Sequence, residues 1–192
     1  MMSSEPATAR SREAARQELL VVRCQLGERE AFDELVDRWH LPIWRYVRRL
    51  VGRDTEAEEV TQEVWLRILR GILALEDPAR LPAWIFTIAR RAVMDRLRVR
   101  YAQASLVPLE EEPAVLLGTE EPDLGWMDEE ILEQALLELS PMEREVLVLF
   151  HLQELTLREV AEVLGIPPGT VKSRLSRARV ALEQRLRAKG AR

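Results

Sequence analysis

The chain has 192 residues, of which 47% are hydrophobic and 32% charged, and its formal net charge is -5. This length permits one domain or two small ones. No apolar run approaches the roughly 20 residues that cross a bilayer. The polar N-terminus lacks the apolar stretch of a signal peptide. The single cysteine, Cys24, excludes an internal disulfide framework, and the two histidines lie too far apart in sequence to predict a zinc cluster, so we expect a cytoplasmic protein with no metal, no cofactor and no membrane insertion.

Helical patterns begin early in the chain. Residues 1–16 are polar and are expected to form a disordered arm, whereas from Glu18 onward apolar residues recur at three- and four-residue steps. Pro42 lies within this pattern. Because proline lacks a backbone donor and clashes with the preceding turn, it predicts a kink or a break there.

Two further helices are expected before residue 100. The first covers residues 54–71, where Asp54 can cap the start, acidic residues crowd the first turn and Gly71 can close the end. A loop with two prolines follows. The second helix covers residues 83–100, with apolar residues on one side and arginines on the other.

Residues 101–125 interrupt the helical pattern. They contain six acidic and no basic residues, and prolines and glycines are spread through them. Such a segment repels itself and stays extended, so it predicts an acidic linker between two domains.

Helical patterns resume in residues 126–192. Ser140 is expected to cap a helix that Pro141 opens, and Thr156 with Glu159 forms a capping-box pattern before the next helix. No strand alternation of any length is visible. The sequence therefore predicts an all-α protein of two small helical domains, residues 17–100 and 126–192.

The stretch "GIPPGTVKSRLSRAR" lies in the basic part of the second domain, since residues 163–192 contain eight basic residues and one acidic residue. Gly165 can end one helix and Pro168 or Gly169 can begin the next, which is the form of a helix-turn-helix. A buried stripe is predicted along the second helix at Val171, Leu175, Ala178, Leu182 and Leu186. The candidate DNA contacts lie off this stripe: Thr170, Lys172, Ser173, Arg174, Ser176, Arg177 and Arg179. A solvated basic helix face is the alternative.

The segment "LSPMEREVLVLFHLQELTLREVAEVLGIPPGTVKSRLSRAR" resembles region 4 of extracytoplasmic-function (ECF) sigma factors of the sigma-70 family. The resemblance implies that this domain recognises the promoter −35 element. Helix-turn-helix units of this type also occur in activators and response regulators, so this segment alone does not decide the function.

The segment "DTEAEEVTQEVWLRILRG" resembles region 2.2 of the same family, which docks on the clamp of the polymerase β′ subunit. The resemblance implies contacts to core RNA polymerase from side chains outside the apolar stripe, namely Asp54, Glu58, Glu59, Gln62, Glu63 and Leu66. From the residues alone, a well-capped surface helix explains the same pattern.

The segment "LPAWIFTIARRAVMDRLRVR" resembles regions 2.3 and 2.4, which recognise and melt the −10 element. Arg91 departs from the family, which usually has asparagine there. Trp84 is either a stacking platform for a base or a core residue, and the preceding loop "EDPARLPA" would hold an unstacked base. The implied −10 contacts are Arg80, Trp84, Arg90, Arg91, Arg96 and Arg98.

The resemblance covers residues 31–100 and 135–186 in the order of the family. It implies an alternative sigma factor, which is not an enzyme, with core RNA polymerase, promoter DNA and an anti-sigma factor as partners. Two alternatives remain from the residues alone: a dimeric activator or repressor that uses the helix-turn-helix, and a helical protein-interaction module. Cys24 is expected to be a packing residue.

Overall fold

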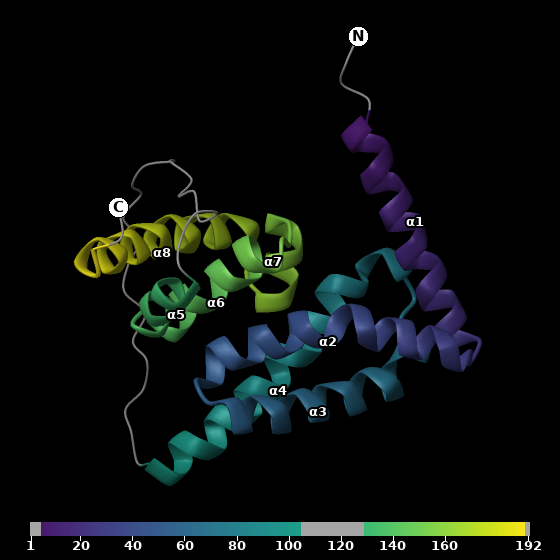
Figure 1. The fold of residues 1–192 in the computed structure, drawn as a ribbon, viewed down its shortest axis with the longest axis horizontal. Helices are drawn as coiled ribbons and strands as arrows, with labels where there is room; N and C mark the ends of the chain where they lie inside the picture. Colours follow the sequence, from purple (N-terminus) through teal and green to yellow (C-terminus); the bar gives the residue numbers. More distant parts are fainter. Residues whose placement is uncertain (1–4, 105–128, 191–192) are drawn as a thin grey trace.

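The structure is a computed structural model that describes the backbone of residues 5–104 and 129–190 and the side chains of 12–100 and 130–190. These residues form helices and contain no strand, which confirms the predicted all-α fold (Figure 1). The elements in chain order are α1 (Glu5–Gln25), α2 (Arg29–Val51), α3 (Asp54–Gly71), η1 (Ile72–Ala74), η2 (Pro78–Arg80), α4 (Leu81–Ala104), α5 (Glu129–Leu137), α6 (Pro141–Leu147), η3 (Val148–Leu152), α7 (Leu157–Leu164) and α8 (Pro168–Ala188).

The first two helices differ from the sequence expectation. Helix α1 begins at Glu5, so most of the segment expected to be a disordered arm is helical. Its residues are good helix formers without an apolar stripe, which is why periodicity did not reveal them. Helix α2 runs through Pro42 without a break. Its buried face packs against α1, α3 and α4, and this burial outweighs the roughly 3 kcal/mol that an interior proline costs.

Helix α3 begins and ends close to the predicted residues. Its N-cap is Arg53 rather than Asp54, and the Asp54 carboxylate pairs with the guanidinium of Arg48 instead of capping the helix. The helix ends at Gly71, as expected. A Cβ atom at this position would lie 3.1 Å from Cζ2 of Trp84, so the glycine lets α4 approach the end of α3.

The predicted helix starts in the second half are confirmed. Ser140 with Glu143 and Thr156 with Glu159 form complete capping boxes at α6 and α7. The helix after Ser140 is shorter than expected, because its last five residues form the π-helical turn η3. The expected linker over 101–125 lies outside the described residues except for the end of α4.

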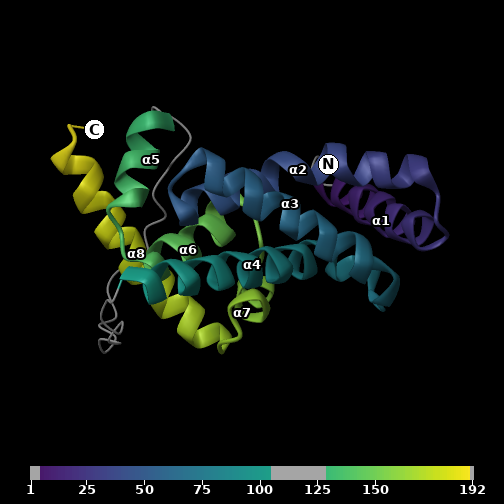
Figure 2. The same cartoon turned by 90° about the horizontal axis from the view of Figure 1, so that it is seen from below.

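The buried side chains form one hydrophobic cluster that includes residues of both predicted domains. Helices α5 and α6 pack against α2, and α7 packs against α4. Figure 2 shows α7 beside α4. The two domains that the sequence separates are therefore docked on each other.

Candidate nucleic-acid and protein interfaces

Helices α7 and α8 form the predicted helix-turn-helix. Gly165 has φ 67°, the left-handed conformation that suits glycine at the end of a helix. Pro168 is the first residue of α8, where its missing N–H group costs nothing. Every residue of the predicted stripe on α8 is buried: Val171, Leu175, Ala178, Leu182 and Leu186.

The predicted DNA contacts of α8 lie outside this buried stripe. Lys172 is exposed, and the other side chains are partly exposed. The Ser173 hydroxyl donates to the carbonyl of Thr170 at 3.0 Å, which ties it to the first turn. Arg179 is anchored to its own domain: its Nε atom donates to Nε2 of His151 at 3.2 Å, and its guanidinium lies 5.7 Å from the centre of the Phe150 ring.

The predicted −10 arginines do not share one face of α4. Arg91 and Arg98 on α4 are exposed, and so is Arg80, which precedes α4 in η2. Arg96 turns toward α3, where its Nε donates to Glu56 at 2.9 Å. Two of the five contact the second domain: Arg80 pairs with Glu162 of α7, and Arg90 pairs with Glu145 of α6. The five arginine side chains therefore do not form one surface: they lie toward solvent, toward α3 and toward the second domain.

Trp84 is partly buried and packs against the hydrophobic core, with its ring against Gly71. Of the two roles that the sequence left open for Trp84, packing is the one that the structure shows. Part of the side chain stays accessible.

The outer face of α3 presents all six predicted polymerase contacts. Asp54, Glu58, Glu59, Gln62, Glu63 and Leu66 are exposed. Three of the carboxylates also pair with arginines nearby, Asp54 with Arg48, Glu59 with Arg96 and Glu63 with Arg67. The face is acidic and accessible, which suits a basic partner.

Two comparisons with known sequences decide the family. A family model of Sigma-70 region 2 matches residues 35–102, and one of Sigma-70 region 4 matches residues 129–182. The ECF RNA polymerase sigma factor SigW of Bacillus subtilis is 30% identical over 177 residues, which cover 84% of this chain and 91% of SigW. The chain belongs to the ECF sigma factors. It is therefore an alternative sigma factor that acts in transcription initiation, and it is not an enzyme.

Other relatives agree with this assignment. SigM of Mycobacterium tuberculosis is 31% identical over 160 residues, covering 83% of this sigma factor and 79% of SigM. Among solved structures, the sigma factor RpoE of Bartonella quintana, in complex with the anti-sigma factor NepR, has a TM-score of 0.66 and 24% identity, covering 81% of this chain and 96% of that one. At that identity the likeness shows the fold. Family membership removes the two alternatives of a dimeric activator and of an interaction module.

The sigma factor carries three exposed leucines on α3 and η1, of which the sequence pattern predicted only Leu66 to be exposed. Leu66, Leu69 and Leu73 have exposed fractions of 52%, 44% and 67%. Leu69 lies at the margin of the apolar stripe of α3, so the helical repeat alone does not show that it is exposed. The three leucines extend the acidic face of α3 with apolar surface.

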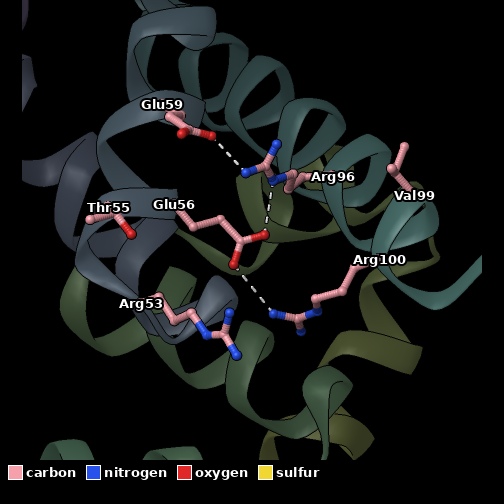
Figure 3. Close-up of a pocket in the computed structure, with 7 residues that line it drawn as sticks. All are labelled: Arg53, Thr55, Glu56, Glu59, Arg96, Val99 and Arg100. Carbon is pink, nitrogen blue, oxygen red and sulfur yellow. Dashed lines mark hydrogen bonds and ion pairs between the residues drawn. The ribbon is translucent and has the colours of Figure 1, made fainter. Parts of the chain in front are cut away.

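Sequence reasoning also missed Glu56. Its side chain is buried between α3 and α4, accepts from Nε of Arg96 at 2.9 Å and lies 3.4 Å from Nη1 of Arg100 (Figure 3). These residues, with Arg53 beside them, line a pocket of about 320 Å³. Glu56 therefore fixes how α4 lies on α3.

In the parts of the chain that the structure describes, no group of three or more metal-ligating side chains is assembled. None of the helices there is both long and apolar enough to cross a membrane.

Proposed function

We propose that this sigma factor works in the cytoplasm, binds core RNA polymerase through α3 and directs it to promoters by two DNA contacts, at the −35 and −10 elements. Its family and its complete helix-turn-helix support this function. The observation that carries the proposal is the division of α8 into a fully buried apolar stripe and an accessible basic face near its N-terminus.

The −35 contact is assigned to the first three turns of α8. The N-terminal residues of a recognition helix reach base edges in the major groove. Arg174 and Arg177 are suited to bidentate bonds with guanine, and Thr170, Ser173 and Ser176 to single bonds. Lys172 and Arg179 are suited to phosphates, and the contacts of Arg179 with Phe150 and His151 hold its guanidinium in place.

The −10 contact is assigned to η2 and α4. Arg91 and Arg98 are exposed and suited to the phosphates of the separated strand. Arg80 and Arg90 lie nearer the loop before α4, where we place an unstacked base beside Trp84. Arg96 is held by Glu56 and Glu59, so its contribution to DNA binding is expected to be smaller.

The polymerase contact is assigned to the outer face of α3. Its acidic side chains suit a basic helix of the β′ clamp, and Leu66 supplies apolar area at one end of the same face. A sigma factor with accessible contact surfaces requires control. We therefore also propose an anti-sigma factor as a partner, by analogy with the complex of RpoE with NepR.

The test uses purified core polymerase and run-off transcription from promoters mapped with the native protein. Arg177→Ala should lower initiation about 5- to 150-fold and relax the preference at one −35 position, because a base contact is lost. Lys172→Ala should weaken all promoters alike and reduce the salt dependence of binding, because a phosphate contact is lost.

Arg187→Ala is the matched control. This arginine is on the same helix, its side chain is 75% exposed and it pairs with Glu183 rather than facing the proposed DNA surface. It should leave initiation unchanged. Failure of the native protein to start transcription with any core polymerase tested, or equal effects of the three variants, would contradict the proposal.

A further inference from the structure

The pocket between the start of α3 and the C-terminal half of α4 is rich in guanidinium groups. Its volume is about 320 Å³, which lies in the range of roughly 300–1,000 Å³ that small-molecule sites have in proteins. Five of its seven lining residues are charged, and the full set is Arg53, Thr55, Glu56, Glu59, Arg96, Val99 and Arg100 (Figure 3). The proposed function gives Arg53 and Arg100 no role.

Carboxylates and a backbone carbonyl hold two of the three guanidinium groups in place. Glu56, whose side chain is 9% exposed, binds both Arg96 and Arg100. Nη1 of Arg100 also donates to the carbonyl of Val51, the last residue of α2, at 3.1 Å. Nη2 of Arg96 donates to Oε2 of Glu59 at 2.6 Å. Because these side chains are already ordered, a ligand that contacts them loses little affinity to their immobilisation.

Arg53 differs from the other two arginines of the pocket. It is exposed, and its side chain makes no hydrogen bond or ion pair with any residue that the structure describes. Its guanidinium points into the pocket, toward Arg100 (Figure 3). The lining has three arginines and two glutamates, which gives a net charge of +1, and Arg53 is the arginine that no carboxylate neutralises. The pocket can therefore accept an anion.

The backbone at the start of α3 adds donors to the same pocket. Arg53 is the N-cap residue of this helix, and no side chain caps it. The N–H groups of the first turn are therefore available to an anion, and the dipole of the 18-residue helix favours negative charge beside them. The hydroxyl of Thr55 lines the pocket as a further donor. Guanidinium groups and free N–H groups together are the donors that bind phosphate groups in proteins.

We propose that this pocket binds a small phosphorylated compound, whose phosphate group lies between Arg53 and Arg100 at the start of α3. The planar guanidinium groups match the oxygen atoms of a phosphate. A phosphodiester of DNA offers the same chemistry. The concave shape favours the small compound, because a backbone phosphate is reached by side chains that project from a surface. This inference goes beyond the proposed function and does not rest on it.

The first experiment titrates the full-length protein, labelled with nitrogen-15, with inorganic pyrophosphate at constant ionic strength. The backbone amide signals of Thr55 and Glu56 should shift until the site is saturated, because their N–H groups belong to the uncapped first turn of α3. The amide signal of Arg70, in the last turn of the same helix, should not shift. This pattern distinguishes a site at the pocket from general attraction of an anion to the protein.

Two variants and one control test the assigned donors. Arg53→Ala should weaken pyrophosphate binding about 10-fold or more, because a hydrogen bond between charged groups is lost. Thr55→Val removes a donor without changing charge and should weaken binding about 2- to 10-fold. Arg70→Ala is the matched control, since Arg70 is an exposed arginine on the same helix, and it should leave the affinity unchanged. Circular dichroism of each variant checks that its helices are intact.

A second titration, with a short fluorescent DNA duplex of random sequence, distinguishes the two sources of phosphate. Arg53→Ala and Arg70→Ala should bind the duplex equally, while Arg53→Ala alone loses affinity for pyrophosphate. Absence of a shift at Thr55 and Glu56, or equal pyrophosphate affinity of the two arginine variants, would overturn the site. A loss of duplex affinity in Arg53→Ala as large as its loss of pyrophosphate affinity would overturn the small compound as ligand, because the pocket would then bind the DNA backbone.

Discussion

The link between Tyr46 and Glu145 makes a quantitative prediction about the docking of the two domains. The ring of Tyr46 is fully buried, lies 5.3 Å from that of Phe86 and donates its hydroxyl to Glu145 at 3.0 Å. Tyr46→Phe keeps the ring and removes the hydrogen bond. A hydrogen bond to a charged group contributes about 1.5–3 kcal/mol, and Glu145 keeps its contact with Arg90, so we expect a loss of about 1.5 kcal/mol at the lower end of that range.

A double-mutant cycle isolates this link. The free energy of unfolding in urea is measured for the native protein, Tyr46→Phe, Glu145→Gln and the double variant, by circular dichroism and by tryptophan fluorescence. We expect a coupling of about 1 kcal/mol, because groups in direct contact couple by about 0.5–3 kcal/mol.

A parallel cycle of Tyr46→Phe with Glu183→Gln is the control, since the second residue is exposed and lies on the far part of α8. Its coupling should stay within about 0.3–0.5 kcal/mol of zero, as for independent sites. A coupling that small for Tyr46 with Glu145 would refute the docking of the domains through this bond.

Four further outcomes are expected. Burial raises the pKa of Cys24 to about 11 from 9.0, so at pH 8 its thiolate fraction falls about 100-fold and iodoacetamide should alkylate it only after denaturation, as followed by mass spectrometry. Thr156→Ala removes the side-chain acceptor of the α7 capping box and should cost about 1 kcal/mol in urea unfolding. Gly165→Ala places a Cβ at φ 67° and should cost about 1 kcal/mol or more, whereas Gly169→Ala, with open space around it, should not. Burial also raises the pKa of Glu145 above 4.5, so the folded state binds more protons at this group than the unfolded state does. The stability of the native protein relative to Glu145→Gln should therefore fall as the pH rises from about 4.5 through the raised pKa, as measured by thermal unfolding.

Local features of the second domain were accurately predicted from sequence. The buried stripe of α8 follows from the 3.6-residue repeat, and the capping boxes at Ser140 and Thr156 follow from hydrogen bonds that span three residues. Each of these depends on neighbours within a few positions of the chain. Pro42 shows the limit of such reasoning, because the packing of α2 against three other helices overrides a strong local signal.

The sequence by itself determined the family, the all-α fold and the placement of the predicted contact residues of α3 and α8 outside the buried stripes, because periodicity sets the buried side of a helix. Only the tertiary structure decided where the arginines of α4 point. Arg96 meets Glu56, and Arg90 meets Glu145, a residue 55 positions away. A charged side chain selects its partner by the distance between helices once they have packed. The repeat of apolar residues along one helix contains no information about the distance between helices. The docking of the two domains therefore could not be predicted from the sequence.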